Sequence, residues 1–505
     1  MSTSRKKILW VDDEIEFFRA HISYLETRGY YVIPAFNGDD AIEKIKNDPD
    51  FFDIVFIDKL MPGKDGLATH SEIKKISFTT PVVLLINRAT DKKEIARSLE
   101  TKISAFVTKP VGCSRLLSVL KNLFDKKETD TRHIVETFLR DYTQIKNLLS
   151  ASSLDYAGYI KLYQSLNRWS IKLDKVDNEE LRQMHAGQVS DCNMHFSNFV
   201  SEQYVRWVSG CSKKPLLSND VMKKVVVPKL IKKQQVILIV LSGMRMDQFV
   251  LMESWLKKAL SYKKRYFFSV LPSSFQYSHR SLLSGLLPAE HSAACMGSSV
   301  MDSLKLGLKK HCDCEPAAKH IDASGKNNYS SLISQVNRDT RSFIVITSDI
   351  MEHLKSNKGT SKTFEDDSTL REQTCEWVAQ SSIVDFIKGI SNESREVILT
   401  SDHGHVYSTR CTEIYGTDEL PENRRYFTGE RISSDERNAL YISEPEQYAL
   451  PNTSPQCKWL IARENFCFTK PGKFEMSLQQ SRFSFQQGGI SMEEMIMPLY
   501  ICSPK

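Results

Sequence analysis

The chain has 505 residues, of which 41% are hydrophobic and 10% aromatic, so length and composition predict several folded domains and exclude a disordered chain. Its 68 lysine and arginine residues against 62 aspartate and glutamate residues leave a net charge of +6, too dilute to indicate a nucleic-acid or membrane surface. Every apolar run is shorter than a bilayer-spanning helix and the first is too short for a secretory signal, so we expect a cytoplasmic protein without membrane insertion.

Residues 1–124 alternate short apolar runs with amphipathic stretches, which is typical of a βα domain. The runs predicted to be strands are residues 7–11, 31–34, 54–57, 82–86 and 105–107. This repetition predicts a parallel sheet with helices on both faces. In such sheets the ligand crevice lies at the carboxyl ends of the strands.

Charged residues stand at those predicted strand ends. Asp12 and Asp13 follow the first strand, Asp58 follows the third, and Lys109 follows the fifth. Three carboxylates at one edge can hold a Mg²⁺ ion while one of them attacks a phosphoryl group, and a lysine can neutralise the phosphoryl oxygens. The sequence therefore predicts a phosphoryl pocket.

Three segments resemble the receiver domain of two-component response regulators over residues 5–123, namely residues 8–14, 55–63 and 107–110. The resemblance implies a flavodoxin-like (βα)₅ fold and a sensor histidine kinase as partner. It also implies that Asp58 is the phosphoacceptor, that Mg²⁺ binds at Asp12, Asp13 and Asp58, and that Lys109 contacts the phosphoryl group.

The switch positions of this resemblance are Phe106, which takes the place of the switch aromatic, and Ile86. The family usually has Thr or Ser at the end of the fourth strand, and its hydroxyl bonds the new phosphoryl oxygen. Ile86 has no hydroxyl, and Asn87 substitutes only if the register slips by one residue. We therefore expect phosphorylation with an altered readout.

Residues 125–208 have a helical pattern, with apolar side chains recurring at intervals of three and four and an interruption at Gly187. We predict an all-α linker bundle. Its apolar stripes are interpreted as packing between helices and against a partner subunit, because no residue of this segment indicates a cofactor.

Short apolar strands return in residues 209–505, at 236–241, 267–271, 343–347 and 397–400, and predict a larger α/β domain. Asp349 and His353 are four positions apart just after the third strand, and Asp402 and His403 follow the fourth. Carboxylate and imidazole are common zinc ligands. A helix cap for Asp349 and a turn hydrogen bond for Asp402 are the ordinary alternatives.

An ordered set of segments resembles the PglZ domain of the alkaline phosphatase superfamily, namely residues 239–247, 271–280 with 284–285, 349–353, 400–404 and 486–496. The resemblance implies an alkaline-phosphatase-like fold and a phosphodiesterase site with two zinc ions, whose retained ligands are Asp349, His353, Asp402 and His403. Arg245, with other basic residues, is a candidate phosphate contact or part of a solvated face.

The sequence departs from this pattern at three positions. It has Ser242 in place of an aspartate ligand, Phe275 in place of the nucleophilic threonine, and Gln487 in place of the last histidine. Ser273 and Ser274 are candidate substitutes for the nucleophile, but only if the backbone shifts. Because two ligands for each ion are fewer than zinc usually has, we expect weak or no zinc binding and a pseudoenzyme.

The order of receiver, helical linker and PglZ domain resembles the PorX-like response regulators. This resemblance implies contact with secretion or motility proteins of the type IX system, and a homodimer that depends on phosphorylation. The alternative function is a metal-dependent phosphodiesterase or phosphatase acting on cyclic or linear oligonucleotides. Direct DNA binding is not expected, because no helix-turn-helix pattern or basic recognition helix follows the receiver.

Overall fold

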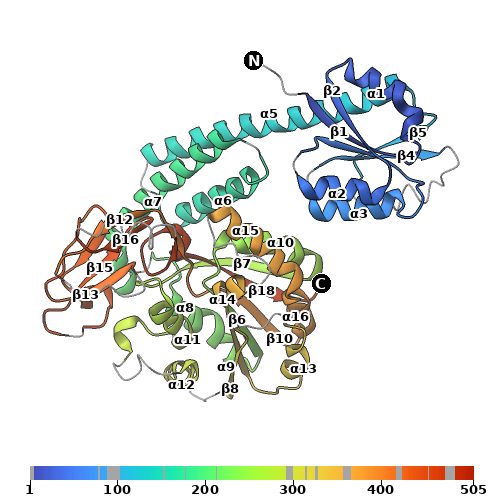
Figure 1. The fold of residues 1–505 in the computed structure, drawn as a ribbon. Helices are drawn as coiled ribbons and strands as arrows, with labels where there is room; N and C mark the ends of the chain where they lie inside the picture. The colour runs from blue at the N-terminus through green and yellow to red at the C-terminus, as the bar shows by residue number, and fades with distance from the viewer. Residues whose placement is uncertain are drawn as a thin grey trace. The chain divides into compact units, whose positions relative to one another are not determined.

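The protein is described by a computed structural model (Figure 1) in which two compact units divide at residues 137 and 138. Side chains of residues 125–133, 151, 353, 355 and 356 lie outside the description. The residues that the structure describes are 5–49, 51–77, 80–87, 103–151, 154–176, 178–211, 213–291, 299–312, 316–324, 328–356, 366–416, 424–452, 454–471 and 484–505.

The first unit contains a five-stranded parallel sheet in the order β2-β1-β3-β4-β5. Its strands are β1 (Lys6–Val11), β2 (Tyr30–Ala35), β3 (Ile54–Asp58), β4 (Val82–Asn87) and β5 (Ala105–Lys109), and its helices are α1 (Arg19–Glu26), α2 (Gly38–Asn47), α3 (Gly66–Ile76) and the first part of α5 (Cys113–Ala151). Successive side chains of a strand point to opposite faces. Leu9 accordingly packs with the core under α2 and α3, and Ile8 with the core under α1 and α5 (Figure 1). The predicted flavodoxin-like fold is confirmed.

The helical segment of the second unit continues from α5 into α6 (Tyr156–Leu173) and α7 (Glu179–Val208). Asp155 and Asn178 cap these two helices, because their side chains accept hydrogen bonds from backbone N–H groups of the first turns. The predicted interruption at Gly187 is wrong, since α7 runs through that position. One unfavourable glycine in a 30-residue helix is offset by the packing of its neighbours.

The linker helices α6 and α7 share a core with the domain that follows them. Tyr159 of α6 and Phe196 and Trp207 of α7 are buried in one cluster with Phe268 and Leu271. The ring of Phe196 lies 5.9 Å from that of Phe268. The linker is therefore packed into the second unit, and its helices also contact one another, as in the packing of Phe138 against Trp169 and His185.

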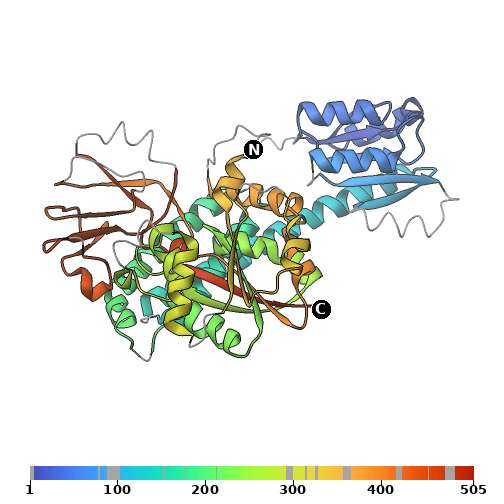
Figure 2. The same ribbon diagram turned by 90° about the horizontal axis from the view of Figure 1, so that it is seen from below.

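A six-stranded sheet in the order β7-β18-β10-β6-β9-β8 forms the centre of the second unit (Figures 1 and 2). Its strands are β6 (Gln235–Ser242), β7 (Ser261–Phe268), β8 (Ala318–Asp322), β9 (Phe343–Asp349), β10 (Arg395–Thr400) and β18 (Ile496–Ser503). The strands from β10 to β8 are parallel, whereas β18 runs antiparallel to β10 and to β7. The predicted strand at 267–271 is wrong at its end, because the chain leaves the sheet at Phe268.

Helices cover both faces of this sheet, so that its central strands are buried over most of their length. One face is covered by α10 (Met246–Ala259), α13 (Leu332–Asn337), α14 (Ile350–Ser356), α15 (Asp367–Gln380) and α16 (Ile383–Ile390). The other is covered by α8 (Ser218–Val221), α9 (Val227–Ile231), α11 (Arg280–Ser284) and α12 (Val300–His311). A short helix, α18 (Met492–Met495), precedes β18.

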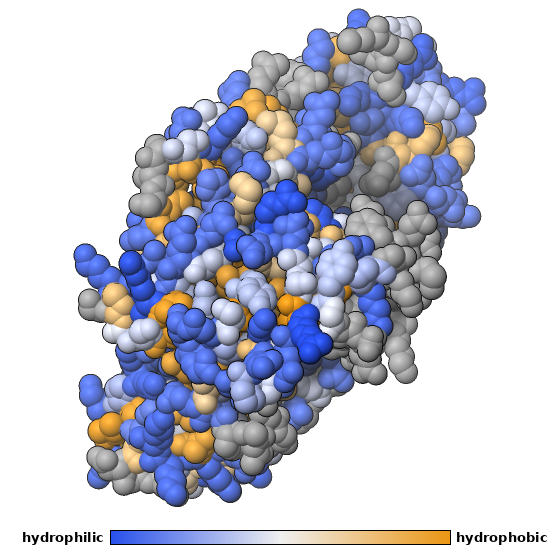
Figure 3. Space-filling model, turned by 90° about the vertical axis from the view of Figure 1, so that its left-hand side faces the viewer, coloured by the Kyte–Doolittle hydropathy of each residue, from blue (hydrophilic) through white to orange (hydrophobic). Residues whose placement is uncertain are grey.

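Smaller sheets follow β10 in the chain. They pair β11 (Val406–Ser408) with β17 (Ser484–Gln486), β12 (Arg410–Glu413) with β16 (Phe466–Thr469), and β15 (Lys458–Ala462) with both β13 (Tyr426–Gly429) and β14 (Ala439–Ile442). Hydrophilic residues predominate on the face drawn in Figure 3, and hydrophobic ones are scattered in small groups. Among the described helices, none has the combination of length and apolar composition that crossing a membrane requires.

Candidate functional site

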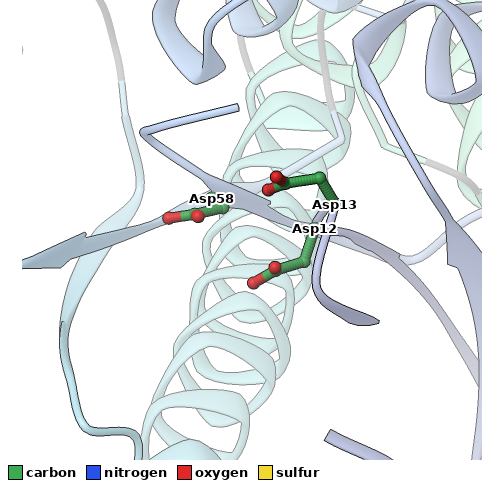
Figure 4. Close-up of side chains that lie close together, drawn as sticks. All are labelled: Asp12, Asp13 and Asp58. Carbon is green, nitrogen blue, oxygen red and sulfur yellow. The ribbon is translucent and has the colours of Figure 1, made fainter. Parts of the chain in front are cut away.

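An acidic pocket lies at the carboxyl ends of β1 and β3 in the first unit. Asp12 and Asp13 directly follow β1, and Asp58 is the last residue of β3 (Figure 4). One carboxylate oxygen of each lies within 4.8 Å of the others. The Lys109 Nζ lies 3.0 Å from Asp12 Oδ2 and 2.9 Å from Asp58 Oδ2. The pocket therefore brings together the four charged residues that strand-end placement predicted.

Burial and charge oppose each other in this pocket. Asp12 and Asp58 are buried, whereas Asp13 is exposed. Burial raises the pKa of Asp58, the neighbouring charge of Asp12 adds to this, and the hydrogen bond from Lys109 only partly offsets it. For Lys109 burial alone would lower the pKa, but the hydrogen bonds to Asp58 and Asp12 raise it. Mg²⁺ fits these residues, because it prefers carboxylate oxygens and would neutralise their repulsion.

The two switch positions lie on β4 and β5. Ile86 is 6% exposed and belongs to the core under α2 and α3, so its side chain is committed to packing. Asn87 extends β4 by one residue, lies exposed and is paired in register with Lys109. Phe106 is half-buried and packs against the same core. The sheet thus leaves a methyl-bearing side chain where the family has a hydroxyl.

In the second unit, the carboxylate of Asp402 is enclosed by hydrogen-bond donors. Ser242 Oγ, at the end of β6, lies 3.1 and 2.9 Å from the two oxygens, and His279 Nδ1 lies 2.8 Å from Oδ2. The backbone N–H groups of Gly243 and His403 donate to Oδ1 at 3.3 and 2.9 Å. Burial alone would raise the pKa of Asp402, but His403, His279 and Ser242 hold it well below its usual range.

A cavity of about 200 Å³ opens beside Asp402 and is lined in part by Ser242, Phe275, His403, His405 and Gln487. His403 Nδ1 bonds the Gly404 carbonyl and His405 Nδ1 bonds the Gly243 carbonyl, at 2.8 and 2.7 Å. Within the described part of the chain, the Nε2 atoms of His279, His403 and His405 have no hydrogen-bond partner. Burial lowers the pKa of His405 to about 3, so this imidazole is neutral at pH 7.

The residues at and near the predicted nucleophile position also differ from those that a hydrolase requires. The side chain of Phe275 is 50% exposed, and its ring stacks on His279 with a centroid distance of 4.5 Å. Its backbone N–H donates to Gln487 Oε1 at 3.1 Å. Ser273 is buried and donates to the Gly489 carbonyl at 2.7 Å, and Ser274 is also buried. Neither serine lines the cavity.

Asp349 ends β9 and caps the helix that follows. Its carboxylate accepts a hydrogen bond from the Glu352 N–H at 3.1 Å. This is the helix cap that the sequence analysis gave as the alternative to zinc ligation. His353 lies in α14, but its side chain is outside the description. Among the described side chains, the receiver carboxylates are the one group of three metal-ligating residues with converging atoms. No group of this kind is found among the described side chains of the second site, to which the side chain of His353 does not belong.

Sequence reasoning missed two histidines of this site. His279 lies on the π-helical turn Phe275–His279, 123 residues before Asp402 in the chain, and His405 directly follows the Asp402–Gly404 turn. His279 lies within segment 271–280, which resembles the PglZ domain, but that resemblance assigned no role to it. Arg245 was also misjudged: it is 3% exposed and forms ion pairs with Asp247 and Asp367, so it is neither a solvated residue nor a free phosphate contact.

The fold and the acidic pocket of the first unit define a response-regulator receiver domain. The family models that match are the response regulator receiver domain over residues 8–121, the PorX response regulator linker domain over 129–208, and the BREX system PglZ alkaline phosphatase-like domain over 221–501. The last model covers more than half of the chain. The chain belongs to the PglZ family and has the domain order of the PorX-like response regulators.

Known relatives match the receiver. They include the transcriptional regulatory protein ResD of Bacillus subtilis, 28% identical over 30% of this chain and 59% of that protein, and the two-component response regulator ARR22 of Arabidopsis thaliana, 26% identical over 23% of this chain and 83% of that protein. The chain thus spans less than two thirds of ResD. A solved CheY-like receiver domain protein from Methanospirillum hungatei is 26% identical over 25% of this chain and 99% of that chain, with a TM-score of 0.24. Receiver domains of this kind pair with sensor histidine kinases.

Proposed function

We propose that this two-component response regulator is switched by phosphorylation of Asp58 and that its PglZ domain acts through protein contacts and not through hydrolysis. The observation that carries the second part is the hydrogen bonding of Asp402. Both oxygens of this carboxylate accept from groups of the chain itself, including Ser242 and His279. A metal ion would have to displace these donors.

The receiver pocket supports the first part. Mg²⁺ held by Asp12, Asp13 and Asp58 would neutralise the oxygens of a phosphoryl donor. The second oxygen of Asp58 is then the nucleophile, because Lys109 holds Oδ2 at 2.9 Å. Phosphorylation replaces this carboxylate by an acyl phosphate, so Lys109 must exchange its ion pair with Asp58 for one with the phosphoryl group.

The second site supports an effector without catalysis. A phenyl ring stands where the family has its nucleophile, and it cannot attack phosphorus. The two nearby serines are buried, and Ser273 is held by the Gly489 carbonyl. Gln487, in place of the last histidine, binds the backbone of Phe275. The residues at the three departures thus make hydrogen bonds within the chain, Ser242 with Asp402 and Gln487 with the backbone of Phe275.

The finer parts of the function rest on the domain order. We propose a homodimer that forms on phosphorylation, with secretion or motility proteins as its targets and without direct contact to DNA. Ile86 belongs to this proposal, because a switch without the usual hydroxyl must transmit phosphorylation through other contacts of the pocket, such as the displacement of Lys109.

Phosphorylation is tested with acetyl phosphate and Mg²⁺ on the wild type, Asp58→Asn and Asp48→Asn, an exposed aspartate of the same unit. Intact mass spectrometry and size-exclusion chromatography are the readouts. We expect phosphorylation and a shift toward the dimer in the wild type and Asp48→Asn, and neither in Asp58→Asn. Labelling of Asp58→Asn at the wild-type level would contradict the assignment of the phosphoacceptor.

One observation favours the alternative, a metal-dependent phosphodiesterase acting on cyclic or linear oligonucleotides. His403 and His405 line the cavity, and the Nε2 atom of each is buried and has no hydrogen-bond partner among the described residues. Zinc analysis and hydrolysis of a chromogenic phosphodiester and of a cyclic dinucleotide separate the two functions. Stoichiometric zinc with turnover that His403→Ala abolishes would replace the effector proposal.

A further inference from the structure

A second cavity, of about 430 Å³, lies within the second unit between the linker helices and the C-terminal domain. It shares no lining residue with the cavity beside Asp402. We name it the linker cavity and define it by Leu166, His185, Val189, Asn193, Arg371 and Glu493. Its wall combines α6 and α7 with the first turns of α10 and α15 and with α18, so a ligand here would contact both parts of the unit.

The wall of the linker cavity has an excess of negative charge. Its lining residues include four arginines and seven carboxylates, an excess of three carboxylates. Every one of these arginines is already neutralised within the wall, and the pairs are Arg182 with Glu179, Arg245 with Asp247 and Asp367, Arg371 with Asp174 and Asp247, and Arg410 with Glu464. The cavity therefore favours a cationic ligand, although the whole chain is positive.

Glu493 is the one buried carboxylate among the described wall residues that no ion pair neutralises. Its side chain is 8% exposed, and both oxygens accept from the single Asn193 Nδ2, at 3.1 and 2.9 Å. Arg245, the cation whose charge acts on it, forms its ion pairs with Asp247 and Asp367 instead, although an ionised carboxylate can accept about four hydrogen bonds. Burial raises its pKa, and the charge of Arg245 and the hydrogen bonds from its own backbone and from Asn193 offset this only in part, so the charged form lacks full compensation. A ligand ammonium group would supply it.

A second polar atom of the wall needs a donor. The Ser170 Oγ lies 3.2 Å from the Leu166 carbonyl and 2.9 Å from His185 Nε2, and we assign the hydroxyl proton to the carbonyl, so that the oxygen accepts from Nε2. The proton of the His185 imidazole is then on Nε2, because burial lowers the pKa of this histidine to about 4 and keeps it neutral. Nδ1 is left as a bare acceptor, buried and without a partner among the described residues. An N–H group of a ligand fits it.

The rest of the wall decides between a metal ion and an organic cation. Leu166 is buried and Val189 half-buried on neighbouring helices, which gives the cavity an apolar side. No three metal-ligating atoms of the described wall converge on one point, as an inorganic ion would require. We propose that the linker cavity binds a linear aliphatic polyamine, with an ammonium group on Glu493, an N–H group on His185 Nδ1, and its methylene chain along the apolar side.

The test is isothermal titration calorimetry of the full-length protein with spermidine and with putrescine at physiological ionic strength. We expect saturable binding at one site in the wild type. Glu493→Gln keeps the shape but removes the charge, and a hydrogen bond to a charged group contributes enough for binding to weaken by about tenfold to a hundredfold. The matched control is Glu202→Gln, an exposed glutamate of the same helix α7 that does not line the cavity, and it should bind as the wild type does.

A second variant guards against misfolding at the buried position. Ser190 is half-buried in the wall on α7, so Ser190→Lys should fold and should place its own ammonium group in the cavity. We expect it to abolish polyamine binding while its thermal unfolding stays close to that of the wild type. Lack of polyamine binding by the wild type, equal binding by Glu493→Gln and Glu202→Gln, or binding of pyrophosphate in place of spermidine would each overturn the proposal.

Discussion

Replacing Ser242 by aspartate should destabilise the second unit, because the new carboxylate would lie beside the buried carboxylate of Asp402. Ser242 Oγ lies 3.1 and 2.9 Å from the two oxygens of Asp402, so Ser242→Asp exchanges a donor for a like charge. Two unit charges about 4 Å apart repel by about 4 kcal/mol at an effective dielectric constant of about 20. We therefore expect the free energy of unfolding to fall by about 4 kcal/mol at pH 8.

The same repulsion predicts the pH dependence. An energy of about 4 kcal/mol corresponds to a rise of about three units in the pKa of one carboxyl of the pair in the folded state. A group whose pKa is raised by folding destabilises the folded state above that pKa, and the destabilisation disappears as the pH falls toward the pKa of the unfolded state. The deficit of Ser242→Asp should thus shrink as the pH falls from about 7 to about 4.

Urea unfolding followed by tryptophan fluorescence measures this effect, with EDTA present so that no metal bridges the two carboxylates. Ser242→Asn is the matched control, because it has nearly the size of aspartate and keeps a hydrogen-bond donor without the charge. Comparison of the two variants at pH 8 and pH 5 isolates the repulsion. Equal unfolding midpoints at pH 8 would refute the reasoning and would mean that Asp402 is not the enclosed anion described above.

Three further predictions concern other contacts of the two units. Arg425→Met should lower the free energy of unfolding by about 3–5 kcal/mol in urea titrations, because it strands the buried carboxylate of Glu494, whose Oε2 lies 2.6 Å from Arg425 Nη2; a loss below about 1 kcal/mol would contradict this. Ile86→Thr should enlarge the size-exclusion shift caused by beryllofluoride, and an unchanged shift would show that the missing hydroxyl does not limit the switch. Lys109→Met should leave Asp58 open to acetyl phosphate but abolish the dimer shift, which combined mass spectrometry and chromatography would detect.

The receiver pocket could be predicted from the sequence because its geometry follows from a local rule. In a parallel sheet, residues that follow neighbouring strands meet at one edge, so the positions of Asp12, Asp58 and Lys109 in the chain were sufficient. The prediction for Asp349 had the same local basis, and the structure shows the helix cap that was its alternative. Zinc ligation by Asp349 depended on a partner side chain whose position no local pattern determines.

The hydrogen bonding of Asp402 could not be predicted, because it depends on contacts between distant parts of the chain. His279 is brought to Asp402 by a π-helical turn, which has no clear sequence signal. The end of β7 at Phe268 was missed because the apolar residues that follow continue the hydrophobic run while packing against the linker helices. The path of α7 through Gly187 was missed for a related reason, since tertiary packing overrides a local propensity.

The shared core of the linker helices and the C-terminal domain determines which parts of the chain can be exchanged. Exchange of the receiver near residue 137 leaves both compact units intact, so receivers of other regulators could be grafted there to place the effector under a new signal. A graft at residue 208 would instead expose Phe196 and Trp207, which are buried against the domain that follows. In evolution, the linker and the PglZ domain should therefore be inherited as one piece and the receiver as another.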